Sequence, residues 1–82
     1  MLKKLDEMKK GETGLIKQVE GEGRIRRRLF DMGVTPGAEV YLRKVAPFGD
    51  PIEITLRGYE LSLRKVEAKS VVVDVHVESE AK

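Results

Sequence analysis

The sequence predicts a small, mostly β domain: a barrel of about five short strands with one short helix inserted after the first strand. The chain has 82 residues, which is enough for one domain and too few for two. Its apolar residues are mainly aliphatic and β-branched, with only two phenylalanines and two tyrosines, and valine-rich segments favour strands. Several segments also alternate apolar and polar residues at the period of a half-buried strand.

The chain begins with apolar residues at a three-residue step, Leu2, Leu5 and Met8. This spacing predicts a short helical turn that packs as a plug or lid. A turn then leads into the first strand, over 13–19.

The segment 24–32 is the one clear amphipathic helix in the sequence. Ile25, Leu29 and Met32 stand at the i, i+4 and i+7 positions that line one helix face. Gly33 follows the last of them, where a left-handed helix cap favours glycine. We therefore expect the helix to end there.

The second half of the chain predicts four more strands and one turn of helix. The strands are expected over 38–43, 52–56, 59–63 and 71–77, and the helical turn lies within 64–70. Five short, twisted strands can close most of the way into a barrel, which limits exposed strand edges. An SH3-like barrel fits best, and an OB-like barrel of similar strand count is the alternative. We expect a single domain over 1–77 and a flexible tail over 78–82.

The sequence argues against an enzyme. It contains no cysteine and a single histidine, His76, so a thiolate nucleophile and a disulfide framework are both excluded. Catalysis needs a base of tuned pKa in a sheltered site, and a barrel this small has little interior to shelter one. We expect no catalytic residues and no cofactor.

Asp74, His76 and Glu78 share one face of the last predicted strand, which raises the question of a metal site. Side chains two positions apart on a strand are separated by about 6.6–7 Å at their bases. Ligands must converge to about 2.0–2.2 Å from a shared ion, which is awkward at that spacing. An ordinary polar strand face is favoured, and no metal site is predicted.

The composition predicts a cytoplasmic protein. The absence of cysteine fits a reducing compartment, and the first residues lack the apolar core of a signal peptide. No apolar run approaches the roughly 20 residues that a membrane span needs. We expect no direct membrane insertion, so any membrane role would come through a partner.

An arginine cluster in the predicted helix is the most informative local feature: Arg24, Arg26, Arg27 and Arg28. At about 100° per residue, Arg26 and Arg27 point outward on the same side as Phe30. Arginine and aromatic residues are enriched at interface anchors, so these three predict a protein-docking patch. The alternative is a solvated face on which a loop covers Phe30 and the arginines pair with nearby acids, namely Glu20, Glu22 and Asp31.

The same arginines also suit the phosphates of RNA or DNA. Against this, the strands offer no series of stacking aromatics, and the net charge is only +2. Nucleic acid is therefore the second interpretation and an improbable partner.

Four segments, taken in this order and spacing, resemble the FeoA family, small proteins of the ferrous iron transport system. They are 11–14 (GETG), 26–37 (RRRLFDMGVTPG), 45–52 (VAPFGDPI) and 57–64 (RGYELSLR). The last strand and the charged tail match less distinctively. The resemblance implies an SH3-like barrel in the cytoplasm. A related barrel is similar to the C-terminal module of iron-dependent repressors, which keeps a transcription-regulatory role open.

The resemblance also implies a partner, a membrane ferrous iron transporter of the FeoB type whose cytosolic part includes a GTP-binding domain. It implies an accessory or regulatory subunit rather than an iron carrier. The residues expected to bind the partner are Arg26, Arg27 and Phe30, with Phe48 and Tyr59 as further candidates near turns. An exposed Phe30 equally suits a homo-oligomer. The face used, the stoichiometry and the sign of the effect stay open.

Overall fold

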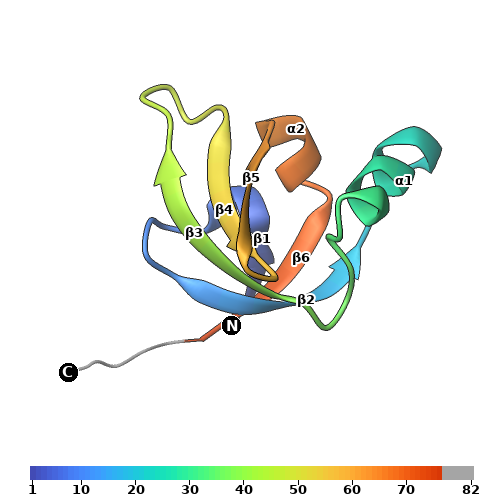
Figure 1. Ribbon diagram of the computed structural model, residues 1–82, viewed down its shortest axis with the longest axis horizontal. Coiled ribbons are helices and arrows are strands. Elements are labelled where there is room, and N and C mark those ends of the chain that lie inside the picture. The colour runs from blue at the N-terminus through green and yellow to red at the C-terminus, as the bar shows by residue number, and fades with distance from the viewer. Residues whose placement is uncertain (77–82) are drawn as a thin grey trace.

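The computed structural model describes residues 1–76, which form one six-stranded antiparallel sheet that curls around a single core (Figure 1). The strands lie in the order β1-β6-β2-β3-β4-β5. The elements in chain order are β1 (Leu2–Lys4), a 3-10 turn η1 (Leu5–Glu7), β2 (Thr13–Val19), α1 (Gly23–Asp31), β3 (Glu39–Val45), β4 (Ile52–Leu56), β5 (Tyr59–Leu63), α2 (Lys65–Ala68) and β6 (Val71–Val75).

The mostly β architecture with a helix after the long strand β2 is confirmed, but the structure has six strands rather than five. The extra strand is β1, which lies where the sequence predicted a helical turn. Leu2 and Lys4 pair with Asp74 and Val72 of β6, at the other end of the chain. Only the segment after β1 is helical, as the short turn η1 that buries Leu5. The apolar spacing missed β1 because its pairing partner is some 70 residues away.

The strands predicted over 13–19, 52–56 and 59–63 are confirmed with the same bounds, and the helix and the strand predicted over 38–43 differ by one or two residues. The described part of the last strand ends at Val75. The predicted tail, 78–82, and Val77 lie outside the described residues.

The core is built from the inward rows of the strands. Ile54, Leu56 and Val73 are each completely buried, and the outward residues between them are at least partly exposed. Burying such a side chain stabilises the fold by roughly 1.5–3 kcal/mol. Register shifts in β2 and β3 bend those strands, as bulges do, and help the sheet to curl.

The end of α1 is fixed by the predicted glycine. Gly33 has a φ of +91°, and its N–H donates to Phe30 O at 2.9 Å. The N–H of Val34 donates to Leu29 O at 2.9 Å, which completes a Schellman cap. Leu29 and Val34 are both fully buried, so this cap also anchors α1 to the barrel.

Candidate interaction surface

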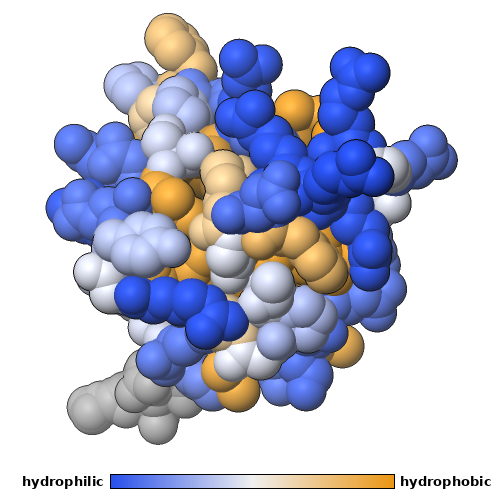
Figure 2. All heavy atoms as spheres, turned by 45° about the vertical axis from the view of Figure 1, so that its right-hand side comes forward, coloured by the Kyte–Doolittle hydropathy of each residue, from blue (hydrophilic) through white to orange (hydrophobic). Residues whose placement is uncertain are grey.

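The inward side of α1 is apolar, as predicted. Leu29 is fully buried in the core, and Ile25 and Met32 are half-buried against it. The rest of the helix faces solvent. On the side of the molecule that carries α1, Figure 2 shows strongly hydrophilic side chains with apolar patches between them.

Arg26 and Phe30 form a stacked pair on the outward side of α1. The guanidinium carbon of Arg26 lies 4.7 Å from the centre of the Phe30 ring, which is cation–π geometry. The same guanidinium is held by a hydrogen bond from its Nε to Val19 O at 3.1 Å. Phe30 keeps 36% of its surface exposed. The predicted outward aromatic is therefore present, and an arginine rather than a loop lies over it.

A shallow hollow of about 350 Å³ lies against this pair. It is lined by Gly23, Arg26, Arg27 and Phe30. We call these four residues, together with Arg24, the α1 surface. The three candidate residues from α1 are thus brought together in one place.

Arg28 belongs to a different environment from its neighbour Arg27. Its Nε lies 2.8 Å from Glu67 Oε2, and Glu67 is buried. The other carboxylate oxygen of Glu67 accepts the N–H of Arg64 at 3.0 Å. Arg28 therefore ties α1 to α2.

The alternative in which the arginines pair with nearby acids is wrong about the partners. Glu20 pairs with Lys4 at 2.6 Å instead. Within residues 1–76, Arg24, Arg26 and Arg27 make no ion pair, because the carboxylate that meets the cluster comes from α2 and reaches only Arg28. The α1 surface consequently carries three positive charges that are not neutralised by this part of the chain.

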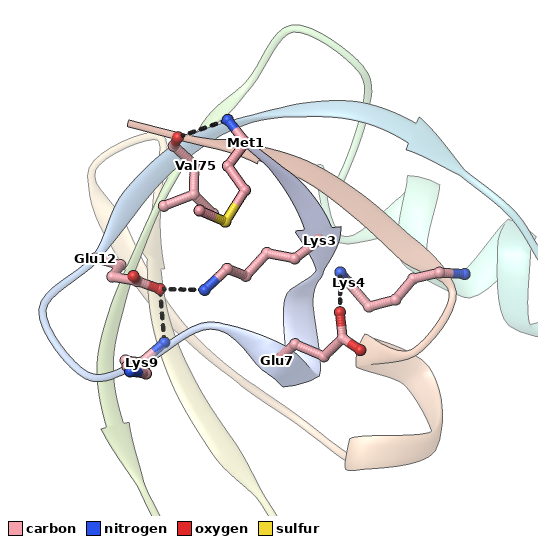
Figure 3. Close-up of polar contacts among 7 residues, drawn as sticks. All are labelled: Met1, Lys3, Lys4, Glu7, Lys9, Glu12 and Val75. Atoms are coloured by element: carbon pink, nitrogen blue, oxygen red, sulfur yellow. Dashed lines mark hydrogen bonds and ion pairs between the residues drawn. The ribbon is translucent and has the colours of Figure 1, made fainter. Parts of the chain in front are cut away.

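Lys3 and Lys4 of the N-terminal segment are, by contrast, each paired with a carboxylate, and Figure 3 shows the pair that Lys3 makes with Glu12. Lys3 Nζ lies 3.3 Å from Glu12 Oε1, which also accepts the N–H of Lys9 at 2.8 Å. Burial opposes ionisation of Glu12, but these hydrogen bonds outweigh it, and the pKa of Glu12 lies below its usual value. These charges stabilise the fold and leave little for a partner.

Tyr59 lies beside the C-terminal end of α1. A Cβ added at Gly33 would come within 3.6 Å of the Tyr59 hydroxyl, and Tyr59 is 54% exposed. The preceding residue pair, Arg57 and Gly58, makes the two-residue turn between β4 and β5 with positive φ at both positions. Arg57 Nη2 donates to Thr35 Oγ1 at 2.9 Å, which secures this turn to the segment that follows α1.

Phe48 is not part of the α1 surface. It lies in the loop between β3 and β4, which Figure 1 shows on the opposite side of the barrel from α1. With 96% of its surface exposed, it is the most exposed large hydrophobic residue described. Three of the five predicted partner-binding residues, Arg26, Arg27 and Phe30, thus lie together. Tyr59 lies next to them at the end of α1, and Phe48 lies apart in the loop between β3 and β4.

Glu67 and Arg57 are the functional-surface residues that the sequence did not identify. Glu67 forms an ion pair with Arg28 and with no other arginine of α1, and Arg57 fixes the turn that precedes Tyr59. The Arg57-Gly58 dipeptide between two alternating strands is a recognisable two-residue turn signal. No comparable sequence signal links Glu67 to Arg28.

The possible metal ligands do not form a site in the described chain. Asp74 Oδ1 bonds instead to the amino terminus at 2.8 Å, and this contact lowers the pKa of Asp74. His76 is exposed, and Glu78 lies outside the described residues. Among residues 1–76, no three His, Asp or Glu side chains are grouped so that they could hold an ion.

Two other hollows, each of about 480 Å³, are open and polar. One lies over Thr13, Tyr41 and Thr55 on the outer face of the sheet, and the other lies between Arg28, Arg64 and Ser62. Neither encloses a sheltered acid–base pair. Of the helices within residues 1–76, none has the length and apolar character to cross a membrane.

Comparison with known proteins places this arrangement in a family. A FeoA-like protein from Clostridium acetobutylicum, solved by NMR, is 40% identical with a TM-score of 0.88, over 96% of this chain and 92% of that one. FeoA from Stenotrophomonas maltophilia, solved with zinc, is 30% identical with a TM-score of 0.78, over 88% and 89% of the two chains. It is described as a prokaryotic SH3 domain protein and a candidate activating factor for ferrous iron transport. The SH3-like architecture is thereby confirmed.

A curated relative links the domain to a transporter. It is the Fe(2+) transport protein A/Fe(2+) transporter FeoB fusion protein of Porphyromonas gingivalis, 32% identical over 72 residues. The match covers 88% of this chain and only 8% of the fusion protein. The family model for the FeoA domain matches residues 3–75. The chain therefore belongs to the FeoA family, whose members are linked to ferrous iron transport.

Proposed function

We propose that this protein is a non-catalytic accessory and regulatory subunit of ferrous iron uptake. It docks on the cytosolic part of a FeoB-type membrane transporter and modulates the assembly or the GTP-dependent cycle of that transporter. The observation that carries the proposal is the fusion relative, in which a region similar to this chain and a FeoB transporter share one polypeptide. Two domains fused in one relative act close together, and this chain resembles one of them.

The α1 surface is the docking face in this proposal. Its three unneutralised arginines suit an acidic region on the partner. The half-exposed ring of Phe30, already held in place by Arg26, supplies apolar area at little further entropic cost. Tyr59, at the end of α1, extends this face. Phe48 lies too far round the barrel to share it.

A binding role also accounts for the site chemistry. The one buried carboxylate described, Glu67, has both oxygens engaged by Arg28 and Arg64. These contacts give Glu67 a structural role, because they join α2 to α1. The protein would act in the cytoplasm through contact alone, without a cofactor.

Calorimetric titration against the transporter's isolated cytosolic domain tests the proposal. Combining Arg27→Glu with Phe30→Ala should weaken binding by at least about tenfold, since anchor residues contribute about 2 kcal/mol or more. Lys10→Glu, a charge reversal at an exposed turn residue before β2, serves as the control and should bind normally. Wild-type protein that does not bind would refute the partner, and a double variant that binds fully would refute the face.

GTP hydrolysis by the transporter, measured with and without this protein, tests the regulatory part. A change in rate that the double variant fails to produce is expected. Nucleic acid is the competing occupant of the same arginines. Tight, steeply salt-dependent binding of generic RNA or duplex DNA, lost in Arg27→Glu, would favour that alternative.

A further inference from the structure

The loop between β3 and β4 carries a solvent-exposed aromatic residue, Phe48, away from α1. This loop, residues 46–51, reads Ala-Pro-Phe-Gly-Asp-Pro, and Phe48 near its centre is 96% exposed. Figure 1 shows the loop extending beyond the sheet. Phe48 lines none of the hollows described above. A single exposed apolar side chain is common at protein surfaces, and it indicates a binding surface only where further exposed apolar or charged residues lie near it.

The loop that carries Phe48 and the adjacent start of α2 together present apolar and basic side chains. The N–H of Lys65 donates to Asp50 Oδ1 at 2.9 Å, which links the loop to the first turn of α2. Figure 1 shows α2 and the loop at the same end of the barrel. Val45 is 39% exposed and Val66 is 56% exposed. We call this region the hairpin end: Lys44, Val45, Phe48, Arg64, Lys65 and Val66.

The charge of the hairpin end is positive. Lys44, Arg64 and Lys65 are exposed and make no ion pair within residues 1–76. Of the neighbouring acids, Glu53 pairs with Arg43 and Glu67 pairs with Arg28, whereas Asp50 accepts only a backbone N–H and keeps its charge, so three basic groups stand against one acid. The basic groups are therefore free to meet an anionic surface.

We propose that the hairpin end binds the surface of an anionic lipid bilayer. The Phe48 ring enters the interfacial layer, while Lys44, Arg64 and Lys65 lie against lipid phosphates. Aromatic side chains favour this boundary, and basic side chains near it are attracted by anionic headgroups. The sequence led us to expect membrane contact only through a partner. The hairpin end offers a direct surface contact that needs no membrane span.

The shape of the hairpin end favours a bilayer over a protein as its occupant. Anchors in protein interfaces are surrounded by a ring of further contacts that excludes water. Phe48 instead protrudes from a convex loop whose flanking residues are proline and glycine. The interfacial layer of a lipid bilayer is fluid, so it can take up a protruding ring without a complementary pocket. Phe48 and the α1 surface lie on different parts of the barrel, with α2 between them, and no residue belongs to both surfaces.

The absence of tryptophan from the sequence allows a direct test. Phe48→Trp places the sole tryptophan of the sequence at the tip, where it can be excited selectively, and Tyr41→Trp, on the outer face of β3, is the matched control. Vesicles of phosphatidylcholine with phosphatidylglycerol should shift the emission of the Phe48→Trp variant to the blue and leave that of the Tyr41→Trp variant unchanged. Pure phosphatidylcholine vesicles should give a much smaller shift.

Cosedimentation with the same anionic vesicles gives a second readout. Phe48→Ser should lower the partition coefficient about tenfold or more, because the ring supplies the buried apolar area. Lys44→Glu combined with Lys65→Glu should abolish the preference for anionic lipid. Thermal unfolding of each variant confirms that it is folded, which is expected since all three residues are exposed.

Three results would overturn the proposal. They are an unshifted emission of the Phe48→Trp variant with anionic vesicles, equal shifts in the two tryptophan variants, and a shift in the Phe48→Trp variant that appears only when the transporter's cytosolic domain is added. The last would assign the hairpin end to a protein partner. The first two outcomes concern lipid binding alone and leave docking through the α1 surface untouched, whereas the third would add the hairpin end to the surface that meets the transporter.

Discussion

Arg27 and Arg28 are neighbours in α1, yet the fold gives them different roles. Arg28 meets a buried carboxylate at 2.8 Å and joins two helices. Arg27 lines an open hollow beside Phe30 and makes no ion pair within the described part of the chain. One helix thus has a side that holds the barrel together and a side that is free to bind. Both residues are arginines, so their different roles follow from their surroundings: Glu67 lies opposite Arg28 and not opposite Arg27.

The core-facing side of α1 should show the largest effect on stability. Leu29→Ala leaves a cavity beneath the helix and should lower the free energy of unfolding by about 2–5 kcal/mol. Denaturant unfolding followed by circular dichroism measures this change. Should the loss stay below about 1 kcal/mol, α1 would not be anchored as described.

The link between α1 and α2 should show the next largest effect. Glu67→Ala removes the acceptor of the Arg64 N–H and the partner of Arg28, at a cost of about 1–3 kcal/mol. Glu20→Ala, which breaks the exposed pair with Lys4, is the matched control and should cost about 0–1 kcal/mol. If the two variants lost the same free energy of unfolding, burial of Glu67 would make no contribution to stability.

The C-terminal cap of α1 should show the third largest effect on stability. Gly33→Ala has room for its Cβ, with nothing nearer than 3.6 Å, but must hold a φ of +91°. The left-handed backbone should cost about 1–2 kcal/mol. A melting temperature that is unchanged or raised in this variant would argue against the Schellman cap.

The paired charges of the N-terminal segment should give a smaller, pH-dependent effect. The pKa of Glu12 in the folded state lies below its ordinary value of 4.5. Its contribution to stability is therefore present above that value and is lost as the pH falls through the folded-state pKa. Glu12→Gln should be less stable than wild type at neutral pH, and the gap should close in acid. Exposed Glu39→Gln is the control, and a gap that is constant with pH would contradict the expectation.

Local patterns were sufficient to predict most of the fold. Period-two alternation located the strand of Ile54, and the glycine after Met32 located the helix cap. These signals lie within a few residues of the structure they predict. Strand β1 was missed because its backbone partners lie in β6, at the far end of the chain.

The candidate surface was predicted only in part, for the same reason. Helical geometry alone places Arg26, Arg27 and Phe30 on one side. The separation of Arg28 from them depends on Glu67, 39 positions later, and the isolation of Phe48 depends on how the sheet curls. Contacts between residues so far apart in the chain produce no periodic pattern in a single sequence, so they could not be predicted from it.

A paired comparison of Arg27→Ala and Arg28→Ala tests the central claim most directly. Both variants remove one arginine from α1, and for each we would measure the affinity for the transporter's cytosolic domain and the free energy of unfolding. We expect Arg27→Ala to weaken binding about fivefold or more with unfolding unchanged. Arg28→Ala should lower the stability by a modest amount, up to about 1 kcal/mol, and leave the affinity close to wild type. If both variants bind like wild type, or if Arg28→Ala alone loses binding, the α1 surface is not the docking face.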